Sequence, residues 1–202
     1  MPTRPPKPAD RKAQPRHRKG AANEQPQKRT IQRLIRERPS PDDFARLDRE
    51  VQQVHSRSAA ILLASEVELY LELAILTKLP NNDADIVKIL VGRDGPLGGF
   101  FAKIHLAFAM GLITADQCHD LNIIRTVRNA FAHAPRPIEF STEEIRTEIG
   151  NLRCIKNFKL PPLPDLAVTL AGMSNDPIRR KFIAAGREIG LALLKTIPPR
   201  RS

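Results

Sequence analysis

One stretch limits the possible folds of this chain more than any other: residues 61–76 read ILLASEVELYLELAIL. A helix that is apolar nearly all round must be buried, and this run is too short to cross a bilayer. The composition is rich in Ala, Leu and Ile, with no Trp and one Tyr, which favours helices over a sheet. The stretch therefore predicts a central helix that other helices surround.

Signals for helix starts recur on both sides of this stretch. Ser40 followed by Pro41 and two aspartates has the form of an N-cap, and residues 114–117 and 141–144 have the pattern of capping boxes. Residues 56–58 could separate the first helix from the central one. The chain should fold as an all-α bundle of about five to seven helices over residues 40–197. The expected helices cover residues 40–54, 61–76, 85–91, 100–110, 114–132, 141–154 and 176–196, with a proline-rich connection at 160–165.

The net charge of +11 is concentrated at the ends of the chain. Residues 1–39 contain twelve Lys and Arg but three Asp and Glu, whereas residues 40–176 contain fourteen and eighteen. The first segment is also proline-rich and nearly lacks large apolar side chains, so we expect a disordered tail, and residues 198–202 form a second basic end. Such a tail attracts nucleic acid without sequence preference. The residues that we expect to contact it are Arg11, Lys12, Arg16, Arg18 and Lys19.

A polar stripe runs along the expected helix at 114–132. At 100° per residue, Asn122, Arg125, Asn129 and His133 share one face, and Arg128 lies beside them. A stripe of this kind either faces water or is buried against polar partners.

The central helix has a polar stripe of its own. Ser65, Glu68 and Glu72 lie within about 60° of one another around its axis, and buried carboxylates need cationic partners. We therefore expect the two helices to pack stripe to stripe, with Arg125 and Arg128 as the cations. Such a cluster is either an ion-pair network that fixes the packing or a functional site.

The functional alternative is metal-free cleavage of RNA by the 2′-hydroxyl. His133 would act as general acid or base, Arg128 would stabilise the phosphate charge, and Asn129 would orient either group.

Other candidate sites are interpreted structurally. Cys118 and Cys154 form no CxxC pair, so we expect small buried thiols in a reducing compartment and neither a metal nor a cofactor. The glycine-rich segment 92–99 matches neither GxxxxGK[ST] nor GxGxxG and is interpreted as a tight loop. His105 is expected at the core or its boundary. With no signal-peptide core, we expect a cytoplasmic protein without membrane contact.

Three stretches together resemble the mannitol operon repressor family. They are ILLASEVELYLELAIL (61–76), DGPLGGFFAKIHLAFAMGLI (94–113) and HDLNIIRTVRNAFAH (119–133), and the likeness extends over about residues 44–158. The resemblance implies an all-helical fold and repression of a sugar-alcohol operon. Because the chain has no evident helix-turn-helix, it would act through a protein partner or homodimer, for which the apolar helix 100–110 could supply the interface, or through DNA contact by the tails.

RNAFAH is also similar to the R-N-x-x-x-H motif of HEPN domains, helical bundles of which many are dimeric RNases. On that likeness Arg128, Asn129 and His133 match the motif, and Glu68 or Glu72 would be an acidic neighbour. The first hypothesis is thus a non-enzymatic transcriptional regulator, the second a metal-independent RNase of a toxin or defence system, and the third a nucleic-acid-binding module that uses the basic tail.

Overall fold

The computed structural model describes residues 40–92, 94–155 and 176–198, and within these ranges it contains helices and no strand. The prediction of an all-α bundle is confirmed. The expected tail at 1–39 and the proline-rich connection at 160–165 lie outside the described residues. The helices are α2 (Pro41–Gln53), α3 (Ser56–Leu76), α4 (Ala84–Val91), α5 (Phe100–Ala109), α6 (Ala115–His133), α7 (Glu143–Gly150) and α8 (Pro177–Thr196).

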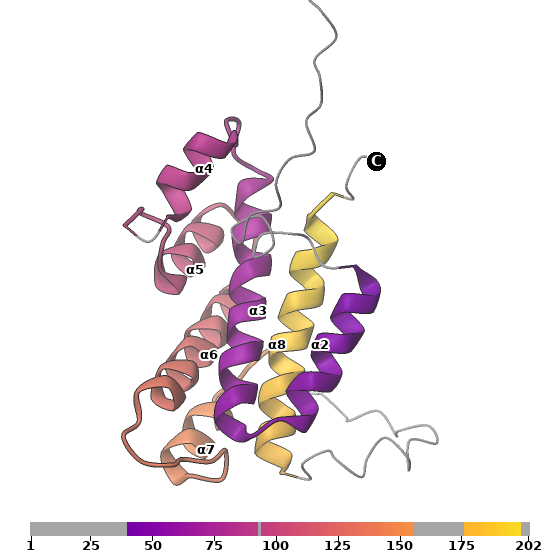
Figure 1. Ribbon diagram of the computed structural model, residues 1–202, viewed down its shortest axis with the longest axis vertical. Coiled ribbons are helices and arrows are strands. Elements are labelled where there is room, and N and C mark those ends of the chain that lie inside the picture. The colour runs from indigo at the N-terminus through magenta and orange to yellow at the C-terminus, as the bar shows by residue number, and fades with distance from the viewer. Residues whose placement is uncertain (1–39, 93, 156–175, 199–202) are drawn as a thin grey trace, which may run out of the picture. The chain divides into compact units, whose positions relative to one another are not determined.

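Helix α3 is the central element, with α5 and α8 on opposite sides of it (Figure 1). It also packs against α2 and α6. Its fully buried apolar residues, among them Leu63, Val67, Leu71 and Ile75, share one side of the helix, whereas apolar residues on the other side, such as Leu73, are half-buried. The interpretation of residues 61–76 as a central helix is therefore confirmed, whereas full burial is limited to one side of it.

Helices α3 and α8 approach each other closely because glycines of α8 lie at their contact. A Cβ added at Gly186 would lie 2.7 Å from Leu63 Cδ2, and one at Gly190 would lie 3.2 Å from Tyr70 Cδ2. The absence of side chains at these two positions lets the large residues of α3 pack onto the backbone of α8.

Three predicted helix ends are confirmed. The Ser40 hydroxyl accepts a hydrogen bond from the Asp43 amide, and the Asp43 carboxylate accepts one from the Ser40 amide. Thr114 and Gln117 form the same reciprocal pair at the start of α6. Gly111, with φ of 68°, follows α5 in the left-handed conformation that ends helices.

Three predicted boundaries are wrong. No capping box forms at Ser141: the helix begins at Glu143, and the Thr142 hydroxyl accepts a hydrogen bond from the Glu139 amide at 3.0 Å instead of capping it. This helix ends at Gly150 rather than near residue 154. The first two helices are separate as expected, but the break lies at residues 54–55 and not at 56–58. There, buried Arg179 of α8 donates hydrogen bonds to the carbonyls at the end of α2.

None of the described helices combines the length and the hydropathy that a bilayer crossing requires.

Candidate functional site

The glutamates of the central helix are paired with a lysine of α5. Lys103 Nζ lies 2.8 Å from Glu68 Oε1 and 2.9 Å from Glu72 Oε2, and its side chain is 6% exposed. The prediction that these carboxylates need a cation is correct. The prediction that Arg125 and Arg128 supply it is wrong, because Lys103 reaches them from the inner side of α5.

The predicted supporting cluster is thus divided by the fold. Glu68 and Glu72 lie together at Lys103, whereas Ser65 is exposed. The guanidinium carbon of Arg125 lies over the ring of Phe101 of α5, 5.2 Å from its centroid, a cation–π contact.

Among the described residues, no ion pair joins Arg125 to a carboxylate. Its side chain is half-buried, and within the described part of the chain its buried Nε donates no hydrogen bond. The His105 ring also packs against Phe101, with the two ring centroids 4.2 Å apart. His105 is exposed rather than at the core, which corrects the expectation for that residue.

The three residues of the R-N-x-x-x-H pattern lie at the end of α6. Arg128 Nη1 donates to Asn129 Oδ1 at 3.0 Å, and both residues are half-buried. His133, the last residue of the helix, is exposed. Among the described residues no hydrogen bond joins His133 to either of them, so the catalytic role stays a prediction.

The carbonyl end of α6 meets the start of α3. Arg57 Nη2 donates to the carbonyl of Ala134 at 3.1 Å and to that of Arg136 at 3.4 Å, and the Ser56 hydroxyl donates to the Glu139 carboxylate. A cation at a helix C-terminus satisfies free carbonyls and complements the helix dipole. Arg57 therefore holds the R-N-x-x-x-H end of α6 against α3.

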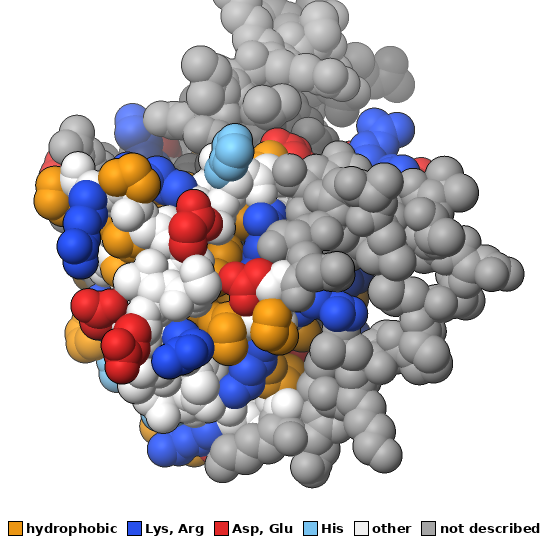
Figure 2. Space-filling model, turned by 90° about the horizontal axis from the view of Figure 1, so that it is seen from below, with side chains coloured by type: hydrophobic (Ala, Val, Ile, Leu, Met, Phe, Trp, Pro, Cys, Tyr) orange, Lys and Arg blue, Asp and Glu red, His pale blue; other side chains and the backbone are white. Residues whose placement is uncertain are grey.

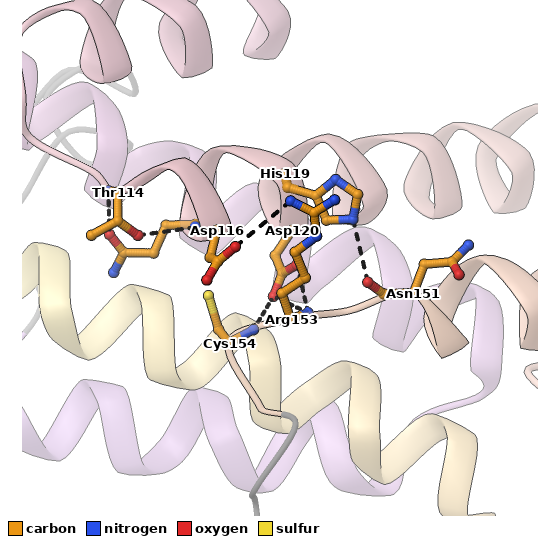
Figure 3. Close-up of polar contacts among 8 residues, drawn as sticks. Thr114, Asp116, His119, Asp120, Asn151, Arg153 and Cys154 are labelled. Carbon is orange, nitrogen blue, oxygen red and sulfur yellow. Dashed lines mark hydrogen bonds and ion pairs between the residues drawn. The ribbon is translucent and has the colours of Figure 1, made fainter.

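A buried carboxylate on α6 holds the chain after α7. Asp120 is fully buried and accepts hydrogen bonds from the amide of Arg153 at 2.9 Å and from that of Cys154 at 2.8 Å (Figure 3). Burial, with the charge of Asp120 adding to it, raises the pKa of the Cys154 thiol to about 12. Sequence reasoning missed Asp120, although an aspartate on the apolar side of α6 signals a buried partner.

Beside this contact lies an open cleft of about 580 Å³. His119 Nε2 lies 3.3 Å from the carbonyl oxygen of Asn151 there, and Arg153 Nη1 lies 3.7 Å from Asp116 Oδ1 (Figure 3). The lining carries both charge signs, so it selects no single class of charged ligand. It consists of His119, Ile123, Glu148, Gly150, Asn151 and Arg153.

A further polar group joins α2, α3 and α8. The Tyr70 hydroxyl donates to the Glu66 carboxylate, and Arg187 Nε lies 3.0 Å from Asp48 Oδ1. Burial raises the pKa of Glu66, and it also raises that of Tyr70. The tyrosine therefore remains a donor at neutral pH.

Comparison with known proteins identifies the family. The family described as "MtlR: Mannitol repressor" matches residues 59–175. The chain is 29% identical over 111 residues to the mannitol operon repressors of Escherichia coli K12 and of E. coli O6:H1 strain CFT073, which covers 55% of this chain and 56% of each relative. It thus spans about half the length of the curated relatives that it matches.

A solved structure shares the fold. The X-ray structure of the MtlR–HPr complex from E. coli matches with a TM-score of 0.50 and 22% identity, covering 76% of this chain and 94% of that chain. The family match extends over more than half of the sequence and includes α4, α5, α6, α7 and all but the first three residues of α3. The chain belongs to the mannitol repressor family.

Proposed function

We propose that this protein is a non-enzymatic transcriptional regulator of the mannitol repressor type, which acts in the cytoplasm mainly through contact with a protein partner. The family match over residues 59–175 carries the proposal. Its relatives are named mannitol operon repressors, and the MtlR of similar fold is in complex with HPr. HPr is therefore the first partner to test.

On the face shown in Figure 2, the charges of the described side chains favour a protein partner over direct nucleic-acid contact. On the face in Figure 2, the visible described side chains mix Lys and Arg with Asp and Glu and with apolar groups. Proteins that bind nucleic acid through a folded surface gather basic residues on one face. A surface of mixed charge is typical of the solvated rim of protein contacts.

Two measurements test the proposal on the full chain. Calorimetric titration with E. coli HPr should give saturable binding, whereas an unrelated protein of similar size and charge should give none. In a host that lacks its own mannitol operon repressor, expression of the chain should restore repression of a reporter placed under the mannitol operator. Absence of both HPr binding and repression would reject the proposal.

A second candidate function is a metal-independent RNase, which the arrangement at the end of α6 favours. Arg128 and Asn129 are hydrogen-bonded to each other, and His133 is exposed to a substrate. The protein should then cleave single-stranded RNA in the presence of a chelator, and His133→Ala should abolish the cleavage. His55→Ala, an exposed histidine outside the motif, is the matched control. Wild-type protein without cleavage, or activity that survives in His133→Ala, rejects the RNase.

A further inference from the structure

We propose that the outer face of α5, together with Arg125 of α6, binds a protein segment that presents a carboxylate beside an apolar side chain. We call this surface the α5–α6 face and define it by Phe101, His105, Phe108 and Arg125. The inference rests on the proposed function, since it assumes that a protein partner binds. It identifies the surface of this protein that the partner contacts and the chemistry that the partner presents.

The apolar part of the face consists of two phenylalanines. Phe101 is 55% exposed and Phe108 is 46% exposed. They are seven residues apart on α5, which places them on the same side of the helix about two turns apart. Exposed aromatic rings of this kind are enriched at the centres of protein interfaces and supply large contact areas with few degrees of freedom. A partner therefore gains most from α5 by covering both rings.

The polar part of the face is the guanidinium of Arg125. The cation–π contact with Phe101 fixes its position, and among the described residues its buried Nε has no acceptor. A buried donor without an acceptor is costly, and a guanidinium is well suited to bind a carboxylate through two parallel hydrogen bonds. A carboxylate from outside would balance the charge of a guanidinium that the fold has already positioned.

The helices that form the face cannot supply this carboxylate themselves. Helix α5 contains no acidic residue (FFAKIHLAFA). On α6, Asp120 is buried against backbone amides and Asp116 lies near Arg153. The two glutamates of α3 that reach α5 are paired with Lys103. Because the described residues of these helices leave no acid for Arg125, we assign that role to a partner.

Charge and ring geometry favour an acidic protein segment over two other occupants. A second copy would bring Arg125 and Arg128 towards their own counterparts, with no carboxylate on either face to balance them. Single-stranded RNA would require free ring faces for stacking, but the Phe101 ring already has Arg125 over it and His105 against it.

The experiment measures binding of two matched peptides to the full chain by fluorescence anisotropy. One is a helical peptide with two leucines seven residues apart and glutamates beside them, and the other has lysines in place of the glutamates. The glutamate peptide should bind at least tenfold more tightly than the lysine peptide. Its affinity should fall at least tenfold in Arg125→Gln and in the double variant Phe101→Ala/Phe108→Ala.

Two control variants remove the same chemistry elsewhere. Leu191→Ala removes an exposed apolar residue of α8, on the other side of α3, and Arg146→Gln removes an exposed cation of α7. Both should bind the glutamate peptide as the wild type does. Circular dichroism and thermal unfolding must show that all four variants are folded.

Three outcomes would overturn the inference. They are no binding of the glutamate peptide, equal binding of both peptides, and equal binding by the face variants and the controls. RNA binding that is lost in Arg125→Gln, or self-association in sedimentation that is lost in the double phenylalanine variant, would assign the face to another occupant.

Repeating the HPr titration with these variants distinguishes this inference from the proposed function. If HPr binds the wild type and the face variants equally, the face is wrong and the proposed function stands. If HPr does not bind but the glutamate peptide does, the face stands and HPr is not its occupant.

Discussion

A single methyl group at Gly186 should destabilise the bundle, and removing part of Leu63 should reverse the sign of that effect. A Cβ at Gly186 would lie 2.7, 2.8 and 3.0 Å from the Cδ2, Cγ and Cδ1 atoms of Leu63, whereas carbon atoms in contact are separated by about 3.5–4.0 Å. Leu63 is 2% exposed and surrounded by core residues. The two helices must therefore move apart by several tenths of an ångström, or Leu63 must leave its rotamer.

Overpacking of this size costs about 1–3 kcal/mol. Replacing a glycine inside a helix by alanine gains about 0.5–1 kcal/mol through helix propensity. We therefore expect Gly186→Ala to lower the free energy of unfolding by about 1–2 kcal/mol. Leu63→Ala alone should lower it by about 2–5 kcal/mol. In that background the new methyl group enters the cavity, so Gly186→Ala should be neutral or stabilising by up to about 1 kcal/mol.

The assay is urea unfolding followed by far-UV circular dichroism for the two single variants and the double variant. Gly150→Ala is the control, because a Cβ at Gly150 meets no atom within 4 Å. Its free energy of unfolding should match or slightly exceed that of the wild type. The reasoning fails if Gly186→Ala has the same effect with and without the Leu63 side chain, since the clash would then play no part.

Three further changes test other contacts. Because the folded state raises the pKa of Glu66 above its ordinary value of 4.5, the fold binds that proton more tightly, and its stability should fall as pH rises from 4.5 through the raised pKa. Glu66→Gln keeps an acceptor for Tyr70 and removes the titrating group. In urea titrations its free energy of unfolding should therefore rise relative to that of the wild type as pH rises. A difference between the two free energies that does not change with pH would contradict this. Asp120→Ala leaves two backbone amides without their acceptor and should cost about 2–4 kcal/mol of unfolding free energy, whereas a loss below about 0.5 kcal/mol would show that water replaces the carboxylate. Deleting residues 1–39 should remove salt-sensitive binding of nucleic acid, and unchanged affinity in filter-binding assays would exclude the tail as the contact.

Local signals in the sequence were sufficient to predict the helices. The periodicity of residues 61–76 predicted burial, and the pairs at Ser40 and Thr114 predicted helix starts, because caps depend on residues three positions apart. The same pattern at Ser141 failed, since the neighbouring Thr142 hydroxyl binds the Glu139 amide. The Ser141 and Thr142 hydroxyls both lie just before this helix in the sequence. The path of the chain before the helix decides how each is used, and no short sequence pattern encodes that path.

The pairing of charged residues between helices was not predictable in the same way. The glutamates of α3 indicated a buried cation, but they did not indicate which helix supplies it. Lys103 was overlooked because it stands in an apolar helix, where its long aliphatic stem packs like a hydrophobic residue and its amine reaches inward. The polar stripe of α6 points to Arg125 as that cation, yet the guanidinium of Arg125 lies over the Phe101 ring, and the glutamates pair with Lys103.

Lys103 also explains why α5 has its charge inside and two aromatic rings outside. Rotating this helix about its own axis would bury Phe101 and Phe108 and expose the lysine together with Phe100 and Ile104, so apolar burial alone does not decide between the two packings. The two carboxylates oppose that competing packing, because the rotation would take Lys103 away from buried Glu72 and half-buried Glu68. The ion pairs of Lys103 with Glu68 and Glu72 thus act mainly by disfavouring the packing in which α5 is rotated. An apolar residue in place of Lys103 would remove this discrimination and leave α5 free to turn its rings inward, away from any partner.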